Sequence, residues 1–485
     1  MMTLGISREY LIENYSAALN DRRASLFVGA GISRAADLVD WRNLLRGIAR
    51  ELKLNVDEEH DLIAIAQYHV NTKGRPNINR LILKEFLKGT AITDNHRLIA
   101  TLPLSEVWTT NYDSLLEDAF EQAHKLTDVK RRANDLSNPI PNANVIIYKM
   151  HGDVKDPDDT VITKDDFEQY NDPQKRQSFT IALQGHLISK SFLFLGISFT
   201  DPNIEYILSR VRSLVGTKAG SEHYCIMKKP SRPSPYKGKA KEAHIRDTAR
   251  LEHSINDLVR FNINTYLVDD YDEITSVLQE LNRQLHLKDI FVSGSAEDYS
   301  PLGRKRIDEL CYTLGSKIID KGFNLVSGFG LGIGSSIVSG AVEAVYRNKQ
   351  AQLSERATLL PFPLNITDPQ KRAETFTKYR TDMISRSGFA LFICGNRGID
   401  HQGNSIIGTG VMEEFDIAKI KKIYPIPVGA TGHAAAEIWK EVAHSPNQFF
   451  GDVNVSKELT ALNDQNKSNS DYLDAIFSII KKVSK

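Results

Sequence analysis

Short apolar runs that end in glycine or in small polar residues recur along the chain and alternate with amphipathic stretches of helical length. Runs of this length are typical of strands, and their continuous apolar character indicates burial on both faces. Strands of this kind that alternate with helices favour a parallel sheet covered by helices on both sides. The first series reads ASLFVGAG, LSEVWTTNYD, NVIIYKMHG, SFLFLGISF, HYCIMKK and INTYLV.

The same pattern begins a second time near Ile290, after a helical stretch. This second series reads DIFVSGSA, FNLVSGFGLGIG, ATLLPFP, FALFICGN and IYPIPVGA. A chain of 485 residues is also too long for one ordinary hydrophobic core. We therefore predict an α/β protein of two domains, residues 1–285 and 286–485, each built on a Rossmann-type parallel sheet.

The composition excludes several classes of partner and site. With 61 basic and 61 acidic side chains, the formal net charge is zero, which gives no electrostatic reason to expect nucleic acid or an anionic membrane as partner. The longest apolar runs are too short to span a bilayer, and the first residues lack the pattern of a signal peptide. The three cysteines, Cys225, Cys311 and Cys394, form no C-x-x-C pair. We expect a cytoplasmic protein without a bound metal.

The segment SLFVGAGIS, residues 25–33, runs from an apolar strand into Gly29 and Gly31. Glycines let the backbone approach a phosphate closely, and the N–H groups at the start of a following helix point toward it. A generic dinucleotide-binding turn would carry a third glycine where this chain has Arg34. A tight turn without a ligand is the alternative interpretation.

Three other segments place small or polar residues directly after apolar strands, at the edge where open α/β sheets bind ligands. They supply Asn111 and Asp113 in WTTNYD, His151 in KMHGD, and Gly196, Ser198 and Asp201 in GISFTD. A histidine whose pKa lies near neutrality can accept a proton during catalysis. The residues alone equally allow a structural role for His151 and a helix N-cap role for Asp113.

In this order, over residues 25–201, the four segments resemble the NAD-binding core of the sirtuin family. That family carries Gly-Ala-Gly-Ile-Ser, then Thr-Gln-Asn-Ile-Asp, then a strand ending in His-Gly, then a Gly-Thr/Ile-Ser turn. The resemblance implies that NAD is the substrate and that Asn111 and His151 are catalytic. It implies that the remaining NAD contacts come from Gly29, Ala30, Gly31, Ser33, Asp113, Gly196 and Ser198.

The chain also departs from the deacylating sirtuins. Those enzymes carry a zinc module of two C-x-x-C pairs, and they have Gly-Ile-Pro-Asp-Phe-Arg where this chain reads RAADLVDWRNLL. We therefore expect water to accept the sugar, so that NAD is hydrolysed to ADP-ribose and nicotinamide. Two alternatives stay open: an NAD-dependent protein deacylase, and a non-catalytic nucleotide-binding signalling scaffold.

In the second domain, two glycine-rich turns follow successive strands. Turns of this kind, followed by helix N-termini, can bind a phosphate or a nucleotide without a metal. Arginine forks suit phosphates and carboxylates suit ribose hydroxyls, although a glutamate at a helix start can also act on the helix dipole alone. The candidate residues are Ser293, Gly294, Ser295, Gly330, Gly332, Arg380, Arg397, Glu413 and Glu414.

This second run resembles the SLOG superfamily, with the motif Pro-Gly-Gly-x-Gly-Thr-x-x-Glu degenerated to GNSIIGTGVMEE. Ligand binding is therefore expected of it rather than catalysis. A sirtuin-like domain followed by a SLOG domain resembles the NAD-degrading effectors of the bacterial Thoeris antiphage system. The resemblance implies a homotetramer whose SLOG domain binds a cyclic ADP-ribose isomer, made by a TIR-domain partner protein, and thereby switches on NAD hydrolysis.

Overall fold

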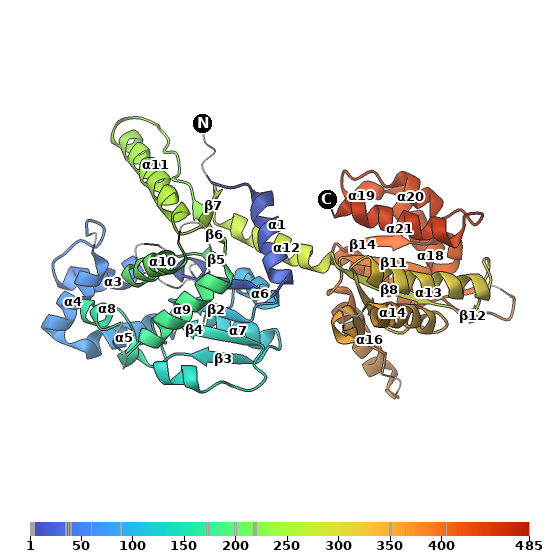
Figure 1. Ribbon diagram of the computed structural model, residues 1–485, viewed down its shortest axis with the longest axis horizontal. Helices are drawn as coiled ribbons and strands as arrows, with labels where there is room; N and C mark the ends of the chain where they lie inside the picture. Colours follow the sequence, from blue (N-terminus) through green and yellow to red (C-terminus); the bar gives the residue numbers. More distant parts are fainter. Residues whose placement is uncertain are drawn as a thin grey trace. The chain divides into compact units, whose positions relative to one another are not determined.

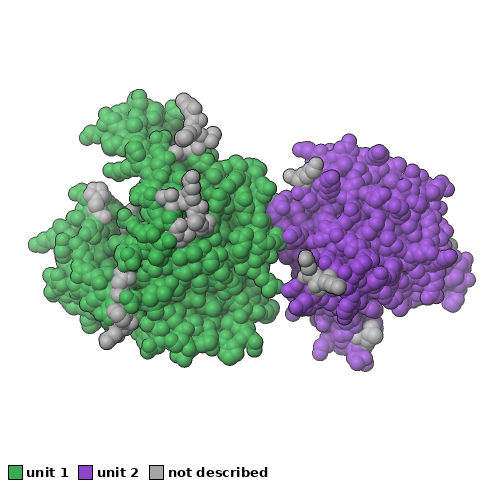
Figure 2. All heavy atoms as spheres, viewed as in Figure 1, with its two compact units in different colours: residues 1–282 green, residues 283–485 purple. Residues whose placement is uncertain are grey.

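The computed structural model describes residues 5–484 except 34, 35, 37, 39, 40, 60, 88, 89, 171, 173, 174, 198, 200, 217–220, 349–351, 364 and 404. The chain divides into two compact units, residues 1–282 and 283–485 (Figure 2). Each unit is built on a parallel sheet with helices packed against it (Figure 1). This architecture confirms the predicted α/β class with two Rossmann-like domains.

The first unit contains a seven-stranded sheet in the order β3–β4–β2–β1–β5–β6–β7, and all neighbouring strands are parallel. Its strands are β1 (Ala24–Val28), β2 (Glu106–Thr109), β3 (Thr127–Lys130), β4 (Val145–Lys149), β5 (Ser191–Leu195), β6 (His223–Lys228) and β7 (Ile263–Val268). All residues of the central strand β1 are buried, because helices cover both faces of the sheet. The edge strand β3 reads TDVK and was not predicted, since it lacks an apolar run.

Twelve named α-helices accompany this sheet in the part of the chain that the structure describes. They are α1 (Arg8–Asn20), α2 (Ala30–Ser33), α3 (Trp41–Glu51), α4 (Leu62–Lys73), α5 (Arg75–Phe86), α6 (Asp94–Thr101), α7 (Leu115–Gln122), α8 (Lys164–Glu168), α9 (Gln177–Ser189), α10 (Pro202–Val215), α11 (Gly238–Val259) and α12 (Asp272–His286). The last of these crosses the division between the two units.

Helices α3, α4 and α5 form a small helical module between β1 and β2 in the sequence (Figure 1). Their apolar side chains share one buried cluster with Tyr112, Val154 and Ile162, which belong to the segments after β2 and β4. The module is therefore anchored by hydrophobic packing to the same segments that carry the predicted catalytic residues.

The second unit contains a five-stranded parallel sheet in the order β10–β9–β8–β11–β14 and a separate antiparallel hairpin, β12–β13. The strands are β8 (Asp289–Ser295), β9 (Asn324–Ser327), β10 (Ala357–Leu359), β11 (Phe389–Cys394), β12 (Asn396–Ile399), β13 (Ser405–Ile407) and β14 (Tyr424–Pro427). The helices are α13 (Arg304–Asp320), α14 (Gly334–Arg347), α15 (Leu353–Arg356), α16 (Pro369–Ile384), α17 (Thr409–Ile420), α18 (His433–His444), α19 (Pro446–Phe450), α20 (Ser456–Ala461) and α21 (Asn469–Val483).

Within the described ranges, no helix is both long enough and apolar enough to cross a bilayer.

Candidate functional site

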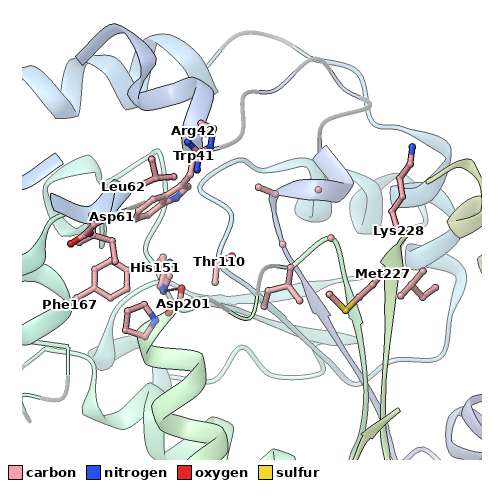
Figure 3. A pocket seen from close by; sticks show the side chains of 18 of the residues that line it. Trp41, Arg42, Asp61, Leu62, Thr110, His151, Phe167, Asp201, Met227 and Lys228 are labelled. Carbon is pink, nitrogen blue, oxygen red and sulfur yellow. Dashed lines mark ion pairs between the residues drawn. The ribbon is translucent and has the colours of Figure 1, made fainter. Parts of the chain in front are cut away.

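A cavity of about 1030 Å³ opens in the first unit where the strands of the sheet end (Figure 3). Its walls come from the segments after β1, β2, β4 and β5, from the end of β6, and from the helical module. The lining residues are Gly29, Ala30, Gly31, Trp41, Arg42, Asp61, Leu62, Ile63, Thr110, His151, Lys164, Phe167, Glu168, Gly196, Ile197, Asp201, Pro202, Ile226, Met227, Lys228 and Tyr271. A cavity at this edge is where an open α/β sheet binds its ligand.

The glycines after β1 and β5 pack backbone against backbone. The Gly31 N–H donates to the Gly196 carbonyl at 2.9 Å. A Cβ on Gly29 would lie 2.5 Å from the Gly196 oxygen, and one on Gly31 would lie 2.7 Å from the Gly196 Cα. Gly196 also adopts a left-handed φ of +63°. The glycine pattern thus has a packing reason of its own, so the glycines by themselves do not indicate a phosphate site.

A buried chain of hydrogen bonds joins the segment after β1 to the segment after β2. The Asn111 Nδ2 donates to the Ser33 Oγ at 3.1 Å and to the Gly29 carbonyl at 3.3 Å, and the Ser33 Oγ donates to the Asp113 Oδ2 at 3.0 Å. The Asn111 Oδ1 is buried and has no hydrogen-bond partner among the described residues. A buried acceptor of this kind is costly unless a ligand or water completes it.

Asp113 has a second structural contact. Its Oδ1 accepts from the Leu115 N–H at 3.1 Å, at the start of α7. Burial raises the pKa of Asp113. The N-cap of α7 is Ser114, so the N-cap role considered for Asp113 from the sequence is wrong; Asp113 precedes the cap and accepts from the first helical N–H.

His151 is 2% exposed and lines the cavity. Its ring packs edge-on against Phe167 and Tyr170, with centroid distances of 5.6 and 6.2 Å. Its Nε2 lies 3.3 Å from the Asp201 Oδ2. Burial lowers the pKa of His151, so the imidazole is neutral at pH 7 and can accept a proton.

The residues of the first domain that were predicted to form the NAD site fall into two groups. Gly29, Ala30, Gly31, His151 and Gly196 line the cavity, whereas Ser33, Asn111 and Asp113 are joined to each other and to the Gly29 carbonyl by buried hydrogen bonds. Ser198 lies outside the described residues.

Sequence reasoning missed two aromatic residues of this wall. Trp41 packs edge-on against Phe167 at 6.2 Å, and Phe167 packs against His151. Together they form an apolar face at the end of the cavity that holds the imidazole (Figure 3). The only signal was the segment RAADLVDWRNLL, which departs from the sirtuin pattern and contains Trp41.

Sequence reasoning also missed Lys149, which is fully buried at the end of β4. Its Nζ donates to the Asp113 carbonyl at 2.5 Å and forms ion pairs with Asp153 at 2.8 Å and Glu117 at 3.1 Å. Burial opposes its charge, but Glu117 and Asp153 outweigh burial and raise the pKa of Lys149. The lysine thus ties the segment after β2 to the segment that carries His151.

Substituting Lys149 with methionine should destabilise the protein by up to about 3–5 kcal/mol, because it removes the buried cation of Asp153 and Glu117 and leaves Arg131 as their remaining ionic partner. Urea unfolding followed by circular dichroism measures this loss. The control is Lys229→Met, which removes an exposed partner of Asp269 and should cost far less. Equal unfolding midpoints for the two variants would show that the Lys149 ion pairs contribute no more to stability than an exposed ion pair does.

In the second unit, four of the predicted residues form one cluster. The Arg380 Nη1 lies 2.7 Å from the Glu413 Oε2, and its Nε lies 3.4 Å from the Glu414 Oε1. The Ser293 Oγ donates to the Glu414 Oε2. Burial raises the pKa of Glu414 to about 7, and the Arg380 guanidinium lies over the ring of Phe362.

The glycine-rich turns after β8 and β9 pack tightly against each other. A Cβ on Gly330 would lie 1.9 Å from the Gly294 carbonyl oxygen, and one on Gly332 would lie 1.9 Å from the Ala296 oxygen. The Ser295 Oγ donates to the Asn396 carbonyl at 2.9 Å. Arg397 lies exposed on β12, in contrast to the buried Arg380.

Comparison with known proteins identifies both units. Residues 105–249 match the SIR2-like domain family, and residues 273–483 match the Sir2- and TIR-associating SLOG family. The chain is 38% identical over 480 residues to the NAD(+) hydrolase ThsA of Bacillus cereus (strain MSX-D12), which covers 98% of each chain. It is 36% identical over 486 residues to the protein of the same name from Cytobacillus dafuensis, covering 99% of this chain and 97% of that one. The protein of that name from Acinetobacter baumannii (strain 532279) is 34% identical over 483 residues, covering 98% and 99%.

Proposed function

The chain belongs to the family of NAD(+) hydrolases named ThsA, and from this premise we propose that its first unit hydrolyses NAD to ADP-ribose and nicotinamide. The observation that carries the proposal is the cavity at the ends of the strands, which is lined by the buried His151 and by Gly29, Gly31 and Gly196. Membership of the family supports the reaction, and the cavity supports the roles that we propose for His151 and for the glycines that line it.

The length of the cavity suits an extended dinucleotide. Its lining runs from His151 after β4 to Lys228 at the end of β6, across the strand order β4–β2–β1–β5–β6. Four spacings between neighbouring strands amount to about 19 Å. In this proposal the nicotinamide riboside lies by His151, and the phosphates lie at the packed glycines Gly29, Gly31 and Gly196. The adenosine lies by Met227 and Tyr271.

The proposed step breaks the bond between the ribose C1′ and the nicotinamide nitrogen, and the electron pair leaves with nicotinamide. The ribose then has oxocarbenium character, which polar groups in a preorganised pocket can stabilise. Water attacks C1′, and His151 accepts the proton that is released. The Asn111 Oδ1, which is buried without a partner among the described residues, is the acceptor that would orient the ribose or the water.

Incubation of the purified protein with NAD alone separates this reaction from the alternatives. Hydrolysis releases nicotinamide and ADP-ribose without any acyl peptide, as chromatography of the products would show. A requirement for an acylated peptide would instead indicate a deacylase. The absence of turnover with every added nucleotide, together with nucleotide-induced thermal stabilisation, would indicate a signalling scaffold.

We expect Asn111→Ala to lower nicotinamide release by about 10²-fold, since it removes a buried, preorganised polar group next in sequence to Thr110, which lines the cavity. The melting temperature provides the control, because the same change also removes the hydrogen bonds to Ser33 and to Gly29. A folded variant that releases nicotinamide at the wild-type rate would contradict the assignment of Asn111.

The proposal extends to regulation by the second unit. This unit binds a cyclic ADP-ribose isomer made by a TIR-domain partner, and binding switches on NAD hydrolysis in a homotetramer as a defence against phage. Its match to a family described as Sir2- and TIR-associating supports the partner. The cluster of Ser293, Arg380, Glu413 and Glu414 supports the site, because a guanidinium can pair with a diphosphate and carboxylates can accept from ribose hydroxyls.

A further inference from the structure

Asp201 is held in place by the helix that it begins. It is the N-cap of α10, and its Oδ1 accepts from the Asn203 N–H at 2.9 Å and from the Ile204 N–H at 3.4 Å. Pro202 follows at the first helical position, which suits the proline ring. Because one carboxylate oxygen is held by the helix terminus, the direction of the other is set as well.

The second oxygen of Asp201 faces the imidazole of His151. The Oδ2 lies 3.3 Å from the His151 Nε2, and both residues line the cavity (Figure 3). The separation is an ion-pair distance, whereas the direction is not that of a good hydrogen bond, since Nε2 has no hydrogen-bond partner in the described part of the chain. The pair is therefore placed to become an ion pair when the imidazole gains a proton.

We propose that Asp201 is the positioning residue for His151, a role that rests on the proposed NAD hydrolysis. The negative charge of its carboxylate, 3.3 Å from Nε2, attracts a proton on that nitrogen electrostatically and so favours the tautomer that leaves the lone pair on Nδ1. It also stabilises the imidazolium that forms when His151 accepts the proton released by water. Asp201 itself forms no bond to the substrate.

The other charges near His151 come from α8 and from the start of α9. Arg176, at the N-cap of α9, lowers the pKa of the imidazole, and Asp166 in α8 raises it. The Nη2 of Arg176 donates to Asp159, and the Oδ2 of Asp166 accepts from Arg75 and from two backbone N–H groups. Arg176 and Asp166 thus already bind other groups, whereas the Oδ2 of Asp201 faces the imidazole.

The test is Asp201→Asn, which keeps the N-cap of α10 because asparagine caps helices as well as aspartate does. We expect kcat for NAD hydrolysis to fall at least tenfold while KM changes little, since the lost charge acts on the proton transfer. The acid limb of the kcat/KM profile should also move to lower pH. The acid limb moves in this direction because the carboxylate of Asp201 favours the protonated imidazole. Removing its charge therefore lowers the pKa of His151.

Asp368→Asn is the matched control. Asp368 also precedes a proline and caps a helix, α16, through the Lys371 N–H at 2.9 Å. It is exposed, does not line the cavity and is not part of the cluster of Ser293, Arg380, Glu413 and Glu414, so kcat and the pH profile should stay at their wild-type values. If Asp201→Asn melts below the assay temperature, Asp201→Ser gives the same readout, because serine also caps a helix and carries no charge.

The outcomes separate the two proposals. Wild-type protein that releases no nicotinamide under any condition would contradict the proposed function. Wild-type protein that hydrolyses NAD, together with an Asp201→Asn variant of unchanged kcat and unchanged acid limb, would overturn the role of Asp201 alone. A fall in kcat without a shift of the acid limb would likewise overturn it, because a purely structural role predicts that pattern.

Discussion

Replacing His151 with alanine should lower kcat for NAD hydrolysis by about 10²- to 10⁴-fold, the range over which general acid–base groups contribute. The imidazole lines the cavity and is 2% exposed, and burial lowers its pKa, so that it is a neutral proton acceptor at pH 7. Nicotinamide release at saturating NAD measures the loss.

The control for this experiment is His96→Ala. His96 is also a buried imidazole of the first unit, with its pKa lowered by burial to about 4, but it does not line the cavity. We expect it to lose stability while retaining kcat. If the two variants lost activity equally, the effect would come from removing a buried ring, and His151 would not be the base.

Replacing Arg380 with alanine should abolish the rise in NAD hydrolysis that a cyclic ADP-ribose isomer causes. A hundredfold activation corresponds to about 2.7 kcal/mol of differential binding to the active state, and pairing between a guanidinium and a diphosphate can supply this. Arg380 is 9% exposed and lies against Glu413 and Glu414. The ratio of the rates with and without each isomer of a panel measures the effect.

Two further variants make this second experiment specific. Arg372→Ala removes an exposed arginine from the same helix, α16, where it lies over Phe376, and the response should stay intact. Arg380→Lys keeps the charge but loses the planar fork, so we expect a partial response. A full response from a folded Arg380→Ala variant would place the signal site elsewhere.

The strands and the polar residues at their ends could be predicted because both depend on local sequence. An apolar run followed by glycine or asparagine specifies a buried strand and the turn after it, whatever the rest of the chain does. The segments with Gly29, Asn111, His151 and Gly196 were found in this way. The edge strand β3 was not, because TDVK has no apolar run and forms a strand only by pairing with β4.

The contacts within each site depend on sheet order, which no local pattern contains. Asp201 follows β5 and His151 follows β4, and β2 and β1 lie between those strands in the sheet, so nothing in the sequence joins the two side chains. The burial of Lys149 among carboxylates has the same origin.

The two arginines of the second unit look alike in the sequence, but the structure separates them. Arg380 is enclosed by Glu413 and Glu414, while Arg397 stays exposed on β12. Amino-acid order along one segment thus determined where strands end and which chemistry follows them. Which of those groups face one another, and with what charge, was decided by packing between segments that are distant in sequence.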